Sequence, residues 1–90
     1  MLPRHRKPSH PGDILLKEYL EPNGLTQVQL AQDLRVPLQR INTIINGKRG
    51  MTAETAILLA RRLNTTPEFW MNLQAACDLY EASHRLAQAA

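Results

Sequence analysis

Residues 25–49 limit the possible folds of this chain most strongly, because they predict two short helices joined by a tight turn. Thr26 and Gln29 have the spacing of a capping box, in which the side chain of each residue satisfies a backbone N–H of the other. The helix expected after Thr26 has one narrow apolar stripe: Leu30, Ala31 and Leu34. Pro37 fits the first turn of a helix, where its missing N–H costs little, and predicts a second helix over about residues 37–46.

The second predicted helix has one apolar and one polar side at about 100° per residue. Three side chains share the apolar side: Ile41, Ile44 and Ile45. The polar side and its flanks carry amide, hydroxyl and guanidinium groups: Gln39, Arg40, Asn42, Thr43 and Asn46. Gln and Asn can form paired hydrogen bonds with adenine, Arg can do so with guanine, and Thr can contact a thymine methyl group. The pattern therefore predicts a helix that lies in the major groove of double-stranded DNA.

A basic pair, Lys48 and Arg49, follows directly after this helix. Gly47 can adopt the left-handed conformation that ends a helix, which a side chain would resist. The positive charge also lies in this half of the chain: residues 1–50 contain eight Lys and Arg against four Asp and Glu, whereas residues 51–90 contain three against four. Both observations favour contacts with DNA phosphates, which supply affinity rather than sequence information.

The flanking sequence predicts three further helices and no strand, because no segment has convincing apolar–polar alternation. The first begins near Pro11 and ends at Pro22-Asn23-Gly24, and the other two are capped by Thr52 and Thr66. The predicted fold is an all-α, five-helix domain. Its parts are a flexible basic arm at residues 1–9 and a single domain at 10–90, with the helix-turn-helix at about 26–46 and a long C-terminal helix at about 67–87.

The last predicted helix is longer than the core of one chain requires. Phe69, Trp70 and Leu73 are expected to complete that core. A second copy of the chain is expected to pack against four residues further along the helix: Leu79, Tyr80, Ser83 and Leu86. Such a homodimer would present two recognition helices about one DNA turn, roughly 34 Å, apart.

Several classes of function are not expected. A single cysteine, Cys77, cannot form an intrachain disulfide, and the basic start of the chain lacks the apolar stretch of a secretion signal, so a cytoplasmic protein is expected. No apolar run approaches the length of a membrane span. The histidines have no metal-ligand spacing with Cys77, so neither a metal nor a cofactor is expected. No set of residues supplies the nucleophile, base and oxyanion site of an enzyme.

Residues 25–49 resemble the helix-turn-helix of the phage-repressor-like (XRE) regulators. The likeness rests on the Thr26-Gln27-x-x-Leu30-Ala31 start, the apolar residues at 34, 36, 41 and 44, and the Asn46-Gly47-Lys48 end. Residues 10–15 and 66–74 look like HigA-type antitoxins, so the likeness covers roughly residues 10–82. It implies a small bacterial protein that neutralises a HigB-type mRNA-cleaving toxin and represses its own operon. Two positions depart from the family pattern: Arg35 replaces a frequent turn glycine, and Pro37 replaces a Ser or Thr cap.

On this hypothesis the DNA-binding residues divide by role. Three are expected to contact the DNA backbone: Gln27, Lys48 and Arg49. Four are expected to face base edges, and Arg40 could serve either role: Leu38, Gln39, Asn42 and Thr43. Two alternatives stay open, a stand-alone phage-type repressor without a toxin partner and a protein-interaction module that has lost DNA binding. The polar side of the second helix and the basic pair argue against the module, which would not need them.

Overall fold

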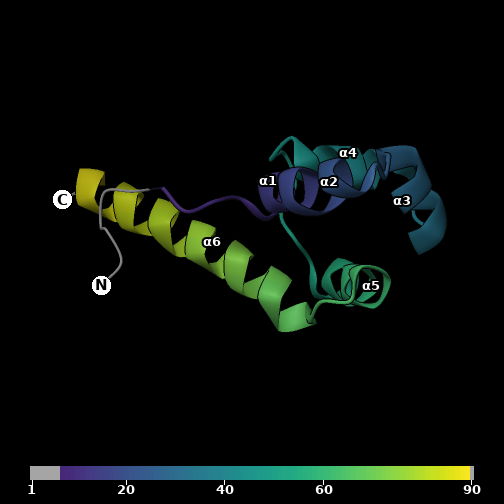
Figure 1. Cartoon of the computed structure of the whole chain (residues 1–90). Coiled ribbons are helices and arrows are strands. Elements are labelled where there is room, and N and C mark those ends of the chain that lie inside the picture. Colours follow the sequence, from purple (N-terminus) through teal and green to yellow (C-terminus); the bar gives the residue numbers. More distant parts are fainter. Residues whose placement is uncertain (1–6, 90) are drawn as a thin grey trace.

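Residues 7–89 are described by a computed structural model, and they fold into five helical rods (Figure 1). The first rod consists of three consecutive segments: α1 (Pro11–Ile14), the π-helical η1 (Leu15–Leu20) and α2 (Glu21–Asn23). Four α-helices follow it: α3 (Gln27–Leu34), α4 (Leu38–Ile45), α5 (Ala53–Leu63) and α6 (Pro67–Ala89). The all-α prediction is confirmed, as is the long last helix. Residues 1–6 of the predicted basic arm lie outside the described residues.

The middle of the first rod is wider than a regular α-helix. At the end of η1 the N–H of Glu21 donates to the carbonyl oxygen of Leu16, five residues back instead of four. Pro22 follows at once, and in a regular α-helix its ring would collide with the carbonyl of Glu18. A wider turn relieves that collision, so the rod continues past the proline. It ends at Gly24, whose φ of 62° lies in the left-handed region.

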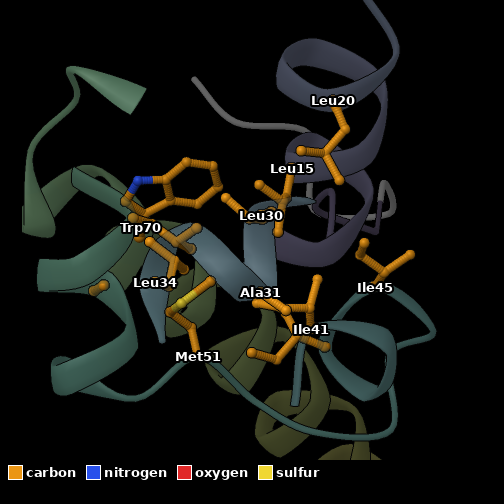
Figure 2. Close-up of a cluster of buried hydrophobic side chains, with 12 residues drawn as sticks. Leu15, Leu20, Leu30, Ala31, Leu34, Ile41, Ile45, Met51 and Trp70 are labelled. Carbon is orange, nitrogen blue, oxygen red and sulfur yellow. The ribbon is translucent and has the colours of Figure 1, made fainter. Parts of the chain in front are cut away.

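One apolar core joins all five rods (Figure 2). The three isoleucines of α4 are buried in it, as their spacing predicted. Large apolar side chains from the other elements belong to the same cluster: Leu15, Leu20, Leu30, Leu34, Met51, Leu59 and Trp70. Full burial of one such side chain contributes about 1.5–3 kcal/mol. The isoleucines therefore hold α4 firmly with its opposite side turned outward.

Trp70 completes the core as predicted: its indole is fully buried, and its Nε1–H donates to the Thr65 hydroxyl at 2.7 Å. Tyr19 packs on it from the first rod, with ring centroids 5.4 Å apart. Leu73 is half-buried against the same core. The prediction was wrong in part for Phe69, which stays 36% exposed and covers the edge of Trp70 at a centroid distance of 5.0 Å. A residue one position earlier on α6 points about 100° away, which leaves Phe69 at the margin.

The turn between α3 and α4 contains Arg35, which has a left-handed backbone conformation. This is the position at which the XRE pattern frequently has a glycine. Arg35 has a φ of 58° and a ψ of 43°. Its N–H donates to the carbonyl oxygen of Gln32 at 3.2 Å, and the N–H of Val36 donates to that of Ala31 at 3.0 Å. The turn thus keeps the shape that glycine favours, and a residue with a Cβ bears strain of about 1 kcal/mol there.

Replacing Arg35 by Gly is expected to raise the free energy of unfolding by about 0.5–1 kcal/mol. Glycine has no Cβ and adopts a positive φ readily, although the more flexible unfolded chain offsets part of the effect. Urea denaturation followed by circular dichroism measures the change. Arg35→Ala is the matched control, since it also removes the guanidinium but keeps the Cβ, and its stability is expected to stay close to that of the wild type. Equal stabilisation by both variants would assign the effect to charge instead of backbone strain.

The start of the first rod lies against the C-terminal end of α4. Gly12 is buried at this contact, and a Cβ on it would lie 2.0 Å from the carbonyl oxygen of Ile44. His10 caps α1, because its Nδ1 accepts from the N–H of Gly12 at 2.9 Å. The missing side chain at residue 12 thus allows two backbones to approach closely, and this contact helps to position α4.

The distal part of α6 extends away from the other helices, as Figure 1 shows. Cys77 is buried where α6 passes the segment before α1, and its Sγ lies 3.5 Å from the carbonyl oxygen of Ser9. Burial raises the pKa of the Cys77 thiol, and the carboxylates of Glu81 and Asp78 raise it further. Cys77 is thus a small packed side chain at this crossing. Among residues 7–89, no helix combines the length and apolar character needed to cross a membrane.

Candidate nucleic-acid interface

α4 turns its polar side to solvent. Gln39 and Asn42 are exposed, and Arg40 and Thr43 are half-buried at the flanks. Leu38, the first residue of α4, is 46% exposed although it is apolar. Within residues 7–89 the chain therefore leaves this side of α4 open for a ligand, as the sequence pattern predicted.

An open depression of about 350 Å³ lies beside α4. Six residues line it, and we call it the α4 depression: Pro37, Gln39, Arg40, Thr43, Lys48 and Arg49. All but Pro37 are predicted DNA-binding residues, so the fold brings five of the eight together on one surface. Its lining combines groups that can read bases with three cationic side chains. The other three predicted residues do not line it: Gln27, Leu38 and Asn42.

The loop after α4 returns the basic pair to the side of that helix. Gly47 has a φ of 73°, as predicted for a left-handed helix end. The backbone N–H groups of Lys48 and Arg49 both donate to the carbonyl oxygen of Thr43, at 2.9 and 3.1 Å. The Thr43 hydroxyl itself donates to the carbonyl oxygen of Gln39 at 2.8 Å. The backbone of the basic pair is therefore fixed to α4, and Thr43 has its methyl group left for contacts outside the helix.

Gln27 and Asn42 belong to a chain of side-chain amides that joins α3 to α4. Nδ2 of Asn46 donates to Oδ1 of Asn42 at 3.2 Å, and Nδ2 of Asn42 donates to Oε1 of Gln27 at 3.3 Å. The Asn42 amide thus has a fixed orientation while keeping one hydrogen and one acceptor lone pair for a ligand. Asn46 was missing from the predicted site, although its position four residues after Asn42 on one helix could have indicated the contact.

Arg40 lines the α4 depression and pairs with a carboxylate of α5. Its Nη1 lies 3.6 Å from Oε1 of Glu54 on α5, and the Glu54 side chain of this pair is largely exposed. An exposed pair of this kind stabilises a fold little, by about 0–1 kcal/mol, but it biases the guanidinium toward Glu54 on α5. The sequence analysis missed Glu54, since no local signal connects it with Arg40 across the intervening loop.

α4 begins at Leu38, one residue later than predicted, because Pro37 takes the cap position with extended backbone angles of −61° and 143°. Pro37 makes no capping hydrogen bond through its side chain. The first backbone N–H groups of a helix have no partner within the helix itself. At α4 the N–H of Arg40 donates to the carbonyl oxygen of Pro37 at 3.0 Å, and no side chain caps the N–H groups that precede it.

The four residues predicted at a dimer interface lie on the distal part of α6. Leu79 is 69% exposed and Leu86 is 72% exposed, and Ser83 is exposed as well. Tyr80 is half-buried and stacks on His84 with ring centroids 4.7 Å apart. Two large apolar side chains of the predicted interface are therefore uncovered in a single chain.

Comparison with known proteins agrees with this geometry. Residues 16–70 match the helix-turn-helix family HTH_3. The HTH-type transcriptional regulator YbaQ of Escherichia coli K12 is 48% identical over 81 residues, which span 90% of this chain and 72% of that protein. Antitoxin HigA-1 of Vibrio cholerae is 41% identical over 85 residues, which span 94% of this chain and 80% of that protein.

A solved structure of Pseudomonas aeruginosa antitoxin HigA with the higBA promoter has a similar fold. Its TM-score is 0.87 at 36% sequence identity, with 91% of this chain and 89% of that chain covered. These relatives are named as a regulator and as antitoxins, in agreement with the prediction that the chain is not an enzyme.

Proposed function

This chain belongs to the helix-turn-helix family of HigA-type antitoxins and related regulators, and we propose that it represses its own operon and neutralises a HigB-type toxin. The DNA-binding part of the proposal rests on one observation above all. The open α4 depression combines base-reading side chains with three cations on a single surface. The antitoxin part rests on the similarity to HigA-1 of Vibrio cholerae and to the Pseudomonas aeruginosa antitoxin HigA.

In the proposed complex α4 lies in the major groove of the operator. Gln39 forms paired hydrogen bonds with adenine, while Leu38 and the methyl group of Thr43 contact thymine methyl groups. Asn42, held by Gln27 from α3, offers its free hydrogen and lone pair to a base edge. Lys48 and Arg49, which follow directly after α4 and line the depression, contact phosphates, while Arg40 contacts either a phosphate or a guanine.

Replacing Gln39 by Ala is expected to weaken operator binding by about 1–3 kcal/mol and binding to random DNA much less, since the lost contact reads a base. Fluorescence anisotropy with the promoter fragment of its own gene and a random fragment of equal length measures both affinities. Gln32→Ala, on the exposed surface of α3 outside the depression, is the matched control and should change neither. An equal loss on both fragments would remove Gln39 from base readout, and a wild-type protein that binds neither at low salt would contradict operator binding.

The proposed operator-binding form is a homodimer joined by the distal part of α6. Leu79 and Leu86 would be covered by the second copy, with Ser83 and Tyr80 beside them. Two α4 helices would then meet a palindromic operator about one DNA turn apart. Sedimentation equilibrium at the concentrations used for DNA binding measures the mass, and the mass of a single chain, free and on DNA, would exclude the dimer.

The toxin partner separates the proposal from its alternative, a stand-alone repressor. The alternative has a specific observation in its favour, the similarity to a relative named as a transcriptional regulator. On our proposal, co-expression restores growth to cells that produce a HigB-type toxin, and the two proteins purify together. Operator binding without rescue or co-purification with a toxin from the same operon would favour the stand-alone repressor. Either function would be carried out in the cytoplasm, where operator DNA and mRNA are located.

A further inference from the structure

Operator binding gives no role to Gln74, the last residue of the segment 66–74 that carries part of the HigA likeness. Gln74 lies half-buried on α6, and its carboxamide contacts the loop at residues 46–52 between α4 and α5. Oε1 of Gln74 accepts from the backbone N–H of Met51 at 2.7 Å, and Nε2 donates to Oδ1 of Asp78 at 2.9 Å. The carboxamide is therefore fixed from both sides.

The backbone of the loop packs directly on this carboxamide. A Cβ on Gly50 would lie 3.3 Å from the oxygen, nitrogen and carbon of the Gln74 amide group, a tight contact that glycine avoids. Met51 is buried, and its N–H lies in a part-buried position where an acceptor from the protein satisfies it. Gln74 supplies that acceptor, and it does so from a helix that belongs to neither part of the helix-turn-helix.

The basic pair itself makes the second contact that fixes this loop. The N–H groups of Lys48 and Arg49 are bonded to Thr43 of α4, while Met51, two residues later, is bonded to Gln74 of α6. A loop fixed at both ends loses little conformational entropy when its side chains bind, whereas a loose loop must be ordered by the ligand. The fixed loop therefore presents both cations to the α4 depression before a ligand is present.

We propose that Gln74 is a positioning residue for DNA binding, which holds the loop at residues 46–52 so that Lys48 and Arg49 are preset for phosphates. This inference rests on the proposed operator binding. It connects α6, the helix proposed to form the dimer, with the residues that supply non-specific affinity. Because phosphates carry no sequence information, Gln74 affects affinity for every DNA sequence and leaves base discrimination unchanged.

Gln74→Met tests the inference, since methionine has a similar length and no amide group. The expected result is a loss of about five-fold in affinity for operator and random DNA alike, the size of effect that one loosened hydrogen bond produces. In a Lys48→Ala/Arg49→Ala background the same substitution is expected to have no further effect, because Gln74 acts through those two side chains. A general loss of structure would instead lower the affinity of both backgrounds by the same factor.

A charge-matched rescue separates the hydrogen bonds from other effects of residue 74. Gln74→Glu keeps an acceptor for Met51 but places a carboxylate beside Asp78, so it is expected to weaken DNA binding. Adding Asp78→Asn restores a donor to the new carboxylate and returns the net charge to the wild-type value. The double variant is expected to bind DNA within about two-fold of wild type. Asp78→Asn alone is the control, since its amide oxygen can still accept from Gln74.

Amide hydrogen exchange at Met51 reports on the anchor without DNA. Slow exchange is expected in the wild type and in the Gln74→Glu/Asp78→Asn variant, and exchange faster by about ten-fold or more in Gln74→Met. Unchanged exchange in Gln74→Met, or a loss of affinity that persists in the Lys48→Ala/Arg49→Ala background, would overturn the inference while operator binding stands. A wild-type protein that binds no DNA would overturn operator binding and, with it, the role of Gln74, even if Met51 exchanges slowly.

Discussion

Gly12→Ala is expected to lower the free energy of unfolding by about 3 kcal/mol or more, although alanine is normally the better helix residue by about 1 kcal/mol. The new Cβ would lie 2.0 Å from the carbonyl oxygen of Ile44 and 2.8 Å from the Cα of Ile45. Both are backbone atoms, so no flexible side chain can move aside, and the first rod must separate from α4. The expected loss is a large part of the roughly 5–13 kcal/mol that a domain of this size has in total.

Urea denaturation of Gly12→Ala and of Gly24→Ala measures the effect against a matched control. A Cβ on Gly24 would have no atom within 4 Å, but the residue has a positive φ. Its substitution is therefore expected to cost only about 1 kcal/mol of backbone strain. If the two variants were equally stable, the close approach of α1 and α4 would not be a constraint.

The same substitution is expected to disturb the loop after α4. The carbonyl oxygen of Ile44 also accepts from the N–H of Gly47 at 3.1 Å, the residue that turns the chain toward the basic pair. A carbonyl displaced by the new methyl group would move that turn. The variant should therefore bind operator and random DNA more weakly even at temperatures where it is folded.

The orientation of α4 could be predicted from sequence because it depends on periodicity alone. Isoleucines at 41, 44 and 45 fall on one side at any helical register, so the polar side had to face outward. The left-handed conformation of Gly47 and the capping box at Thr26 also depend only on neighbouring residues in the sequence, and both are present in the structure. Pro37 was less predictable, since a proline fits the first helical position as well as the extended position that precedes it.

Contacts between distant segments could not be predicted, and they decide how the site is arranged. The bonds of Asn42 with Gln27 and of Arg40 with Glu54 each join different helices, so they depend on how the helices pack. Residue spacing within one helix contains no information about such packing. Phe69 illustrates the same limit, because its apolar character predicted burial while its rotation from Trp70 on α6 left it at the surface.

The Lys48→Ala/Arg49→Ala variant is expected to lose about 60-fold in DNA affinity at 0.1 M salt, on operator and random fragments alike. Each phosphate contact contributes about 0.9 to the slope of log affinity against log salt, so two lost contacts reduce that slope by about 1.8. Between 1 M and 0.1 M salt, a ten-fold change, this difference amounts to a factor of about 60 in affinity. The structure supports two separate contacts, because both residues are exposed, line the α4 depression and have their backbones fixed to Thr43. Anisotropy titrations at four or five salt concentrations measure the slope.

A second double variant tests whether the effect depends on position. Lys17→Ala/Arg61→Ala removes the same charge from exposed residues that do not line the α4 depression. Charges at a distance are screened over about 10 Å at 0.1 M salt, so this variant is expected to keep nearly the full slope. Similar slopes for the two variants would mean that net charge alone attracts DNA. A reduced slope for the basic pair only, with base discrimination intact, would assign phosphate binding to the loop and sequence readout to α4.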